Sequence, residues 1–249
     1  MGLKDLFSSE GRATRARAKH SARIRDKHAQ SMDRQASMEA LDADGSPEAI
    51  VGLLGRFSMR YDKTIEDEQE KNWVYERCKA RGDTIVSSLR TYLLSTETMS
   101  FGLRLLSEMD DLNKVWPVVE ELCARHDNTY TRDPAPKSQL VHFLGEFKDE
   151  RAGRALLPYL EDVDENVRFT AIEGLFEHGK AEVAFAPLLE HLQKPNEESR
   201  RIKRRILEGL AEHCWELGKE RVAEFQKLAD DLWPGSRLDN HGRIKKPTK

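Results

Sequence analysis

The sequence predicts an all-α protein, a right-handed α-α superhelix of about five helical hairpins followed by one C-terminal helix. Two observations indicate this solenoid class. Related segments recur at a mean spacing of about 34 residues, and Glu-Gly-Leu-x-Glu-His occurs both at 173–178 and at 208–213. Apolar residues follow helical spacing, and no segment alternates as a strand does. One hairpin cannot bury its apolar stripe alone, so successive hairpins must stack into a continuous core.

The predicted helices alternate between first and second members of each hairpin. First helices are expected to begin near residues 47, 83, 112, 150, 181 and 219, and second helices near 67, 97, 136, 164 and 197. Ser46 is a suitable N-cap for the first of them, and Pro47 occupies a position where a missing N–H costs nothing. Asp164 and Asn196 are the expected caps of the last two second helices.

Two connections are expected to be non-helical. Residues 126–137 contain Pro134 and Pro136, which predict a long loop, and residues 60–66 form a shorter charged connection. Long loops in a solenoid serve either as binding sites or as tolerated surface insertions.

Composition and charge define three regions in the chain of 249 residues. Its net charge of −3 divides into +2 over residues 1–45, −9 over 46–232 and +4 over 233–249. We therefore expect a basic, largely disordered or partly helical arm at 1–45, the solenoid at 46–232 and a basic tail at 233–249. The acidic body argues against nucleic-acid binding by the solenoid, because duplex affinity comes largely from Lys and Arg.

The sequence also predicts a location. No run reaches the roughly 18 apolar residues of a spanning helix, and residues 1–7 lack the apolar core of a secretory signal. Three scattered cysteines are typical of reduced thiols. We therefore expect a cytoplasmic protein without a transmembrane segment.

Residues 162–175 resemble the turn and second helix of a HEAT repeat. The matching positions are Asp162, Val167, Arg168, Ala171 and Leu175. The preceding residues 151–160 resemble the first helix of that repeat, and the shorter steps between hairpins are similar to the compact HEAT-like repeats of the phycobilisome-lyase type. The valine is expected to enter the core while the arginine bonds the Asp and the carbonyls of the turn and links one hairpin to the next. The resemblance implies a scaffold whose inner, second-helix surface binds another protein.

The basic run at residues 200–205 is the first candidate site. Helical geometry places Arg201, Arg204 and Arg205 away from the apolar stripe. There they form either a binding site for an acidic partner segment or a solvated face paired with carboxylates. The pairs expected in the second case are Glu197–Arg201 and Arg204–Glu208. The candidate partner-binding residues are Arg168, Arg201, Arg204, Arg205 and Trp215.

A second candidate is the net +6 segment at residues 12–28, which has too few apolar residues to fold alone. It serves either to dock on an anionic surface or as a solubilising extension. Its basic residues are Arg12, Arg15, Arg17, Lys19, Arg23, Arg25 and Lys27.

The chemical motifs are weak. Residues 174–181 nearly match the sequence motif of a phosphate-binding loop, but Ala181 replaces the Ser or Thr that would hold Mg²⁺. The pairs Glu177–His178 and Glu212–His213 are too few for a metal site without further converging ligands. We therefore predict a non-enzymatic interaction scaffold with no cofactor and no metal. The alternatives are nucleic-acid binding, through the basic arm or a cleft like that of HEAT-like DNA glycosylases, and a lyase-type enzymatic role.

Overall fold

The computed structural model describes residues 9–247. These residues contain thirteen α-helices, four short 3₁₀ helices and one two-stranded hairpin, which confirms the predicted all-α solenoid class. They divide into two compact units, one ending at Arg125 and one beginning at His126.

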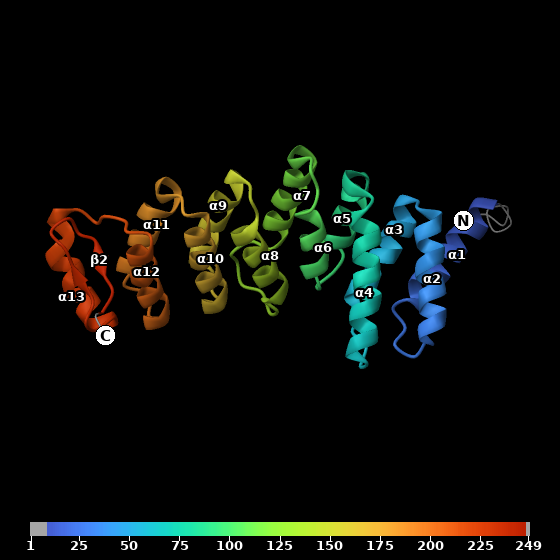
Figure 1. Cartoon of the computed structure of the whole chain (residues 1–249), viewed down its shortest axis with the longest axis horizontal. Helices are drawn as coiled ribbons and strands as arrows, with labels where there is room; N and C mark the ends of the chain where they lie inside the picture. The colour runs from blue at the N-terminus through green and yellow to red at the C-terminus, as the bar shows by residue number, and fades with distance from the viewer. Residues whose placement is uncertain (1–8, 248–249) are drawn as a thin grey trace. The chain divides into compact units, whose positions relative to one another are not determined.

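The N-terminal unit consists of two layers of helices. In the first layer α1, α3, α5 and α7 contact each other in order, and in the second α2, α4 and α6 do so. Figure 1 shows α2 and α4 side by side in this second layer. The bounds are α1 Ser9–Arg23, α2 Ser31–Asp44, α3 Pro47–Leu54, η1 Gly55–Ser58, α4 Thr64–Lys79, η2 Gly82–Ile85, α5 Val86–Leu93, α6 Ser100–Leu106 and α7 Leu112–Arg125.

The C-terminal unit repeats this arrangement. Its second-layer helices α8, α10 and α12 pack in order, α9 contacts α11, and α13 contacts α12. The bounds are α8 Ala135–Glu146, α9 Glu150–Leu156, η3 Leu157–Glu161, α10 Glu165–His178, α11 Ala181–Gln193, α12 Arg200–Glu212, η4 Lys219–Arg221, α13 Val222–Leu232, β1 Arg237–Leu238 and β2 Ile244–Lys245.

The helix starts largely follow the sequence prediction. Ser46 Oγ accepts a hydrogen bond from the Ala49 N–H (3.4 Å), with Pro47 in the first position of α3. Asp164 accepts from the Asn166 and Val167 N–H groups at 2.8 and 3.2 Å. The cap predicted at Asn196 is wrong: α12 begins one turn later, and Ser199 Oγ accepts from the Ile202 N–H.

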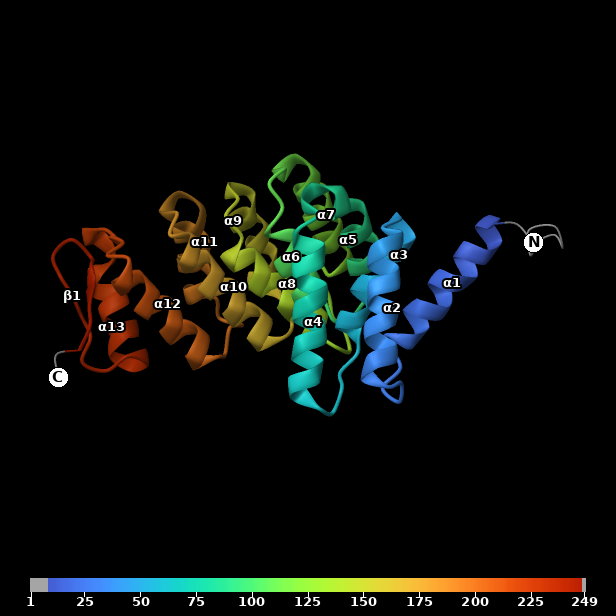
Figure 2. The same ribbon diagram turned by 45° about the vertical axis from the view of Figure 1, so that its right-hand side comes forward.

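The N-terminal arm takes the helical one of its two predicted forms, and it packs on the solenoid. Residues 9–44 form α1 and α2, which pack on each other and on α3, and residues 1–8 lie outside the described part of the chain. Ile24, Met38 and Leu41 are buried in this packing. The segment at 12–28 has too few apolar residues to fold alone, but α2 and α3 supply the apolar surface against which α1 packs. Figure 2 shows α1 reaching outward beyond α2 and α3.

The predicted tail is also partly structured. β1 and β2 pair antiparallel, with Arg237 opposite Lys245 and Leu238 opposite Ile244. Ile244 is buried, β1 contacts α13 and β2 contacts α12. Residues 248–249 lie outside the described residues.

The long loop is shorter than predicted. α8 already begins at Ala135, because Pro136 lies in its first turn, where no backbone N–H is needed. Lys137 is buried and donates to Asp162 (2.6 Å) and to the Thr129 carbonyl (2.7 Å). This lysine therefore anchors the loop to the next hairpin.

Glycines explain the echo between residues 173–178 and 208–213. A Cβ at Gly174 would lie 2.8 Å from the Gly145 Cα, and one at Gly209 would lie 2.2 Å from the Phe176 ring. Each glycine therefore allows the preceding second-layer helix to approach closely, so the repeated Glu-Gly motif is a packing signal.

A buried ionic cluster joins α2, η1 and α4. Arg34 and Arg56 are fully buried, and both donate to Glu70, at distances from 2.8 to 3.1 Å. Arg56 also donates to Asp67 (2.7 Å), as does Lys71 (2.7 Å). Burial would raise the pKa of Glu70 and of Asp67, but these hydrogen bonds outweigh it and lower the pKa of both groups.

Candidate functional site

The first candidate site is a groove of about 690 Å³ in the C-terminal unit, which we call the arginine groove. It lies where α10, α12 and α13 meet and contains three of the predicted partner-binding residues. Its lining residues are Phe169, Arg200, Arg201, Arg204, Arg205, Glu208, Asp231, Leu232 and Pro234.

Two arginines in this groove remain about half exposed. The Arg201 side chain is 54% exposed, and its guanidinium lies 3.8 Å from the centre of the Phe169 ring. The Arg204 side chain is 53% exposed and donates to Glu208 at 2.8 Å, which confirms that predicted pair. The predicted Glu197–Arg201 pair is wrong, because Arg201 instead donates to Asn166 (3.1 Å) and lies 3.7 Å from Glu165.

The other two arginines are more firmly held. Arg205 was expected to point into solvent, but its side chain is only 17% exposed and pairs with Glu173 and Glu212. Burial would lower the pKa of Arg205, and the neighbouring carboxylates raise it instead. Arg200 donates to Asp231 at 2.9 Å. Arg200 is 66% exposed but donates three hydrogen bonds to Asp231, whereas Arg201 and Arg204 each donate one. Arg201 and Arg204 therefore combine exposure with the more weakly held guanidinium groups of this groove.

Arg168 lies outside the arginine groove and links hairpins. It donates to Glu197 Oε2 (2.8 Å) and to the Asp162 carbonyl (2.9 Å), which confirms the expected bond to the turn carbonyls. The expected bond to the Asp162 side chain is wrong, because that carboxylate accepts from Lys137 instead. Burial would raise the pKa of Glu197, but hydrogen bonds from Arg168, the Ser199 N–H and His191 lower it. Glu197 is 4% exposed, so this bridge is internal to the fold.

Trp215 also lies away from the groove lining. Its ring lies 5.7 Å from Phe176, 5.9 Å from Phe185 and 5.2 Å from His213, between ring centres. The side chain therefore belongs to an aromatic cluster that packs the end of α12 against α10 and α11. Cys214 is exposed, because α12 ends at Glu212 and Cys214 adopts a left-handed backbone (φ 54°).

The predicted anionic-docking residues lie on α1 and just after it. Arg12, Arg15, Lys19, Arg25 and Lys27 are exposed, whereas Arg17 and Arg23 are partly covered. Arg17 donates to Ser46 Oγ (3.0 Å) and lies 3.6 Å from Asp44. Among residues 9–247, no carboxylate pairs with Arg12, Lys19 or Arg23.

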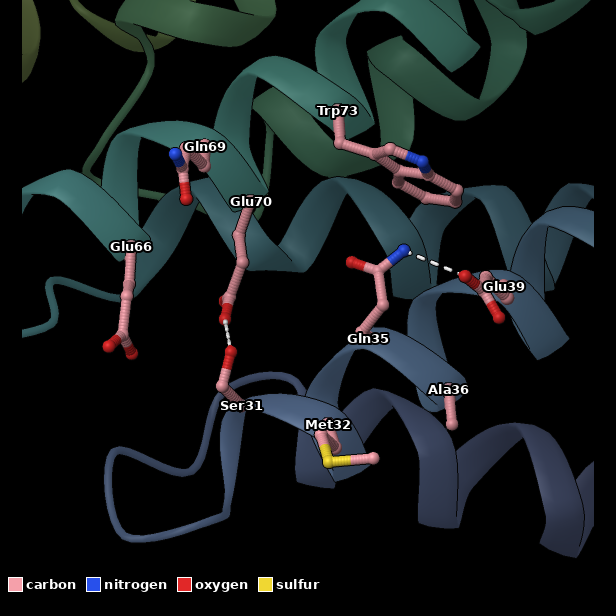
Figure 3. A pocket seen from close by; sticks show the side chains of 9 residues that line it. All are labelled: Ser31, Met32, Gln35, Ala36, Glu39, Glu66, Gln69, Glu70 and Trp73. Atoms are coloured by element: carbon pink, nitrogen blue, oxygen red, sulfur yellow. Dashed lines mark hydrogen bonds between the residues drawn. The ribbon is translucent and has the colours of Figure 1, made fainter.

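A second groove, which sequence reasoning missed, lies between α2 and α4. We call it the carboxylate groove; its volume is about 480 Å³. Figure 3 shows Glu66, Gln69, Glu70 and Trp73 projecting from α4, opposite Gln35, Glu39 and other α2 residues. The sequence signal that could have revealed it is the high acidity of both helices. Its lining residues are Ser31, Met32, Gln35, Ala36, Glu39, Glu66, Gln69, Glu70 and Trp73.

The weaker chemical motifs have structural roles. Gly179 ends α10 in a left-handed conformation (φ 63°), as a C-terminal glycine does. His178 Nε2 donates to the Leu144 carbonyl (2.8 Å), and His213 stacks on Phe176. Within residues 9–247, no three His, Cys, Asp or Glu side chains are grouped to hold a metal ion.

Comparison with known proteins gives one family. Residues 117–211 match the family model of HEAT repeats, a range that includes the resemblance found at 162–175. The chain matches no curated protein and no solved structure. None of the helices in residues 9–247 is long and apolar enough to cross a membrane. Residues 117–211 therefore carry HEAT repeats, and the paired helices and the Arg168 link between hairpins agree with this match.

Proposed function

We propose that the protein is a cytoplasmic, non-enzymatic scaffold that binds another protein on its second-layer helices, and that the arginine groove receives an acidic segment of that partner. HEAT repeats are commonly protein-interaction scaffolds. Solenoids use the extended surface of stacked hairpins for such binding. The observation that carries the proposal is the pair of exposed guanidinium groups of Arg201 and Arg204 beside Phe169.

The chemistry of these two arginines favours a carboxylate-bearing partner. A guanidinium binds a carboxylate through two parallel hydrogen bonds. The surface pair Arg204–Glu208 contributes only about 0–1 kcal/mol, so a partner carboxylate can replace Glu208 with little loss. The Arg201 guanidinium lies over the Phe169 ring in a cation–π contact, and the ring adds apolar contact area.

Charge reversal in the groove tests this proposal. The double variant Arg201→Glu/Arg204→Glu is expected to weaken binding of a fluorescein-labelled peptide that contains four Glu and one Phe by at least about tenfold, since it replaces two attractive contacts by repulsion. Fluorescence anisotropy measures the dissociation constant, and circular dichroism checks that both proteins are folded.

The matched control is Lys227→Glu/Arg237→Glu, which changes the charge equally at exposed residues of the same unit. Its affinity for the peptide is expected to stay within about twofold of the wild type. Equal losses in both double variants would show attraction to net charge alone and would contradict the proposal, as would no binding by the wild type.

A second candidate function is nucleic-acid binding by α1, which its unpaired basic residues favour. Arg12, Lys19 and Arg23 are spaced seven and four residues apart, so they lie along one side of the helix. The exposed neighbours on α1 include alanines but no bulky apolar side chain, which argues against insertion into a membrane. Phosphate groups are therefore the natural ligands of this face.

Salt dependence tests the second candidate. Binding of a 20-base-pair duplex is measured between about 50 and 200 mM salt for the wild type and for Arg12→Ala/Lys19→Ala/Arg23→Ala. Loss of three phosphate contacts is expected to reduce the slope of log K against log salt by about 2.7. The control is Arg132→Ala/Lys227→Ala/Arg237→Ala, at exposed sites elsewhere. A wild type without salt-dependent binding, or two variants with the same slope, would rule the candidate out.

A further inference from the structure

We propose that the carboxylate groove between α2 and α4 docks a partner segment that carries a Lys or Arg beside a bulky apolar side chain. The inference rests on the proposed function, since it assumes a protein partner, and adds a second contact of opposite charge preference to the arginine groove. It is carried by three features of the groove: exposed apolar side chains, a lining with carboxylates but no Lys or Arg, and a rigid base.

The apolar feature is unusual for a helix surface. Met32 is 86% exposed at the edge of the groove, and Ile65, one turn before Gln69 on α4, is 74% exposed. These are two of the five large apolar residues described as exposed in residues 9–247. Trp73 and Ala36 extend this surface along the groove. An apolar side chain of a partner can therefore lie between Met32 and Trp73.

The charge of the groove favours a cation. Its lining contains three carboxylates and no Lys or Arg. Helices α2 and α4 together contain nine Asp or Glu and four Lys or Arg. The same field repels nucleic acid, and the carboxylates do not converge as metal ligands in the described part of the chain. The ligand that this groove favours is therefore a Lys or Arg side chain of a partner protein.

The three carboxylates differ in their availability. Glu70 is neutralised by the buried Arg34 and Arg56. Glu39 accepts a hydrogen bond from the Gln35 amide (2.9 Å), and Glu66 Oε1 accepts from the exposed Lys63 (3.1 Å). Glu66 Oε2 is buried, accepts no hydrogen bond within residues 9–247 and lies 4.0 Å from the Arg34 guanidinium. Glu39, and Glu66 through the Oε1 atom that the exposed Lys63 holds, are therefore the two groups that a partner cation can pair with.

The buried cluster makes the groove rigid. Arg34 comes from α2 and donates to Glu70 of α4 at 2.8 and 3.1 Å, while Ser31 Oγ contacts the same carboxylate at 3.4 Å. These bonds set the distance between the two helices that form the walls, as Figure 3 shows for Ser31 and Glu70. A groove that exists before binding costs little ordering entropy on association.

Charge neutralisation inside the groove, compared with the same change outside it, tests the inference. The probe is a labelled helical peptide built of Leu and Lys at heptad spacing. Glu39→Gln/Glu66→Gln is expected to weaken its binding about tenfold, because both partners of the peptide lysines are lost. Met32→Ser, at a site too exposed to disturb folding, is expected to weaken it about threefold through lost apolar contact.

The matched control is Glu68→Gln/Glu76→Gln, which removes the same charge from exposed positions of α4 outside the groove lining. Its affinity should stay within about twofold of the wild type. Equal weakening by both doubles, or no binding by the wild type, would overturn the inference. Self-association of the wild type that the groove double abolishes would also overturn it, since the occupant would then be a second copy. None of these results changes the outcome for acidic peptides at the arginine groove, so the two proposals fail independently.

Discussion

Replacement of Glu70 by Gln is expected to lower the free energy of unfolding by about 3–5 kcal/mol, the largest effect of any single substitution considered. The carboxylate neutralises two fully buried guanidinium groups, Arg34 and Arg56. Glutamine keeps the size of the side chain but removes its charge, and its amide N–H₂ cannot accept from an arginine. Two buried cations would then lose their main counter-charge. Urea denaturation followed by circular dichroism measures the loss.

The matched control for this prediction is Glu68→Gln, an exposed residue of the same helix, which should change the free energy of unfolding by no more than about 0.5 kcal/mol. The pH dependence gives a second readout. Because folding lowers the pKa of Glu70, its stabilising contribution is complete above its ordinary pKa of 4.5 and is lost as the pH falls through the lower folded value. The difference between wild type and Glu70→Gln should therefore shrink below about pH 4.5. A constant difference down to pH 3 would contradict the role of the charge.

Replacement of Gly174 by Ala is expected to destabilise the protein by about 1–3 kcal/mol, although alanine is the better helix former. The new Cβ would lie 2.8 Å from the Gly145 Cα and 2.8 Å from Leu156 Cδ1. The first of these is backbone and cannot rotate away, so α8 and α10 would have to move apart. Gly145→Ala, whose Cβ would lie 2.9 Å from the Gly174 Cα, should have a similar effect.

Gly153→Ala is the control for the glycine contact. Gly153 is also a buried helical glycine, but its Cβ would lie no closer than 3.6 Å to any neighbour outside the helix. It should therefore gain about 0.5–1 kcal/mol from helix propensity alone. Thermal or urea denaturation of the three variants decides the matter: stabilisation by Gly174→Ala would show that α8 and α10 do not depend on this close approach.

Local sequence signals predicted the course of the backbone well. Ser46 with Pro47, and Asp164 before Val167, mark helix starts because caps and prolines act on neighbouring N–H groups. Their effect depends on residues only two or three positions away. The spacing of hairpins and the turn role of Arg168 followed from the same short-range patterns.

Pairings between distant residues were harder to predict. Arg201 and Glu197 stand at the favoured spacing, yet Glu197 is buried and bound by Arg168 and His191, 29 and 6 residues before it. Arg205 is covered because Phe176 and Glu173 of the preceding second-layer helix lie against it. A helical wheel assigns faces within one helix and contains no information about which helix covers which face.

The carboxylate groove likewise depends on contacts between residues that are distant in the sequence. Sequence alone determined that residues 31–44 and 64–79 are polar and acidic, but not that the two segments lie side by side. Glu70 reaches the Arg34 guanidinium from 36 residues further along the chain, and this contact joins the two helices that form the walls of the groove.

The sequence by itself determined an all-α repeat protein with its helix starts, its apolar stripes and its uneven charge, because these depend on periodicity and neighbouring residues. Only the tertiary structure decided that residues 9–44 are folded, that Arg201 and Arg204 stay accessible while Arg168 and Arg205 do not, and that α2 and α4 enclose a groove. The reason is physical: burial and ion pairing depend on which surfaces meet in space, and those partners lie about one repeat away in the chain.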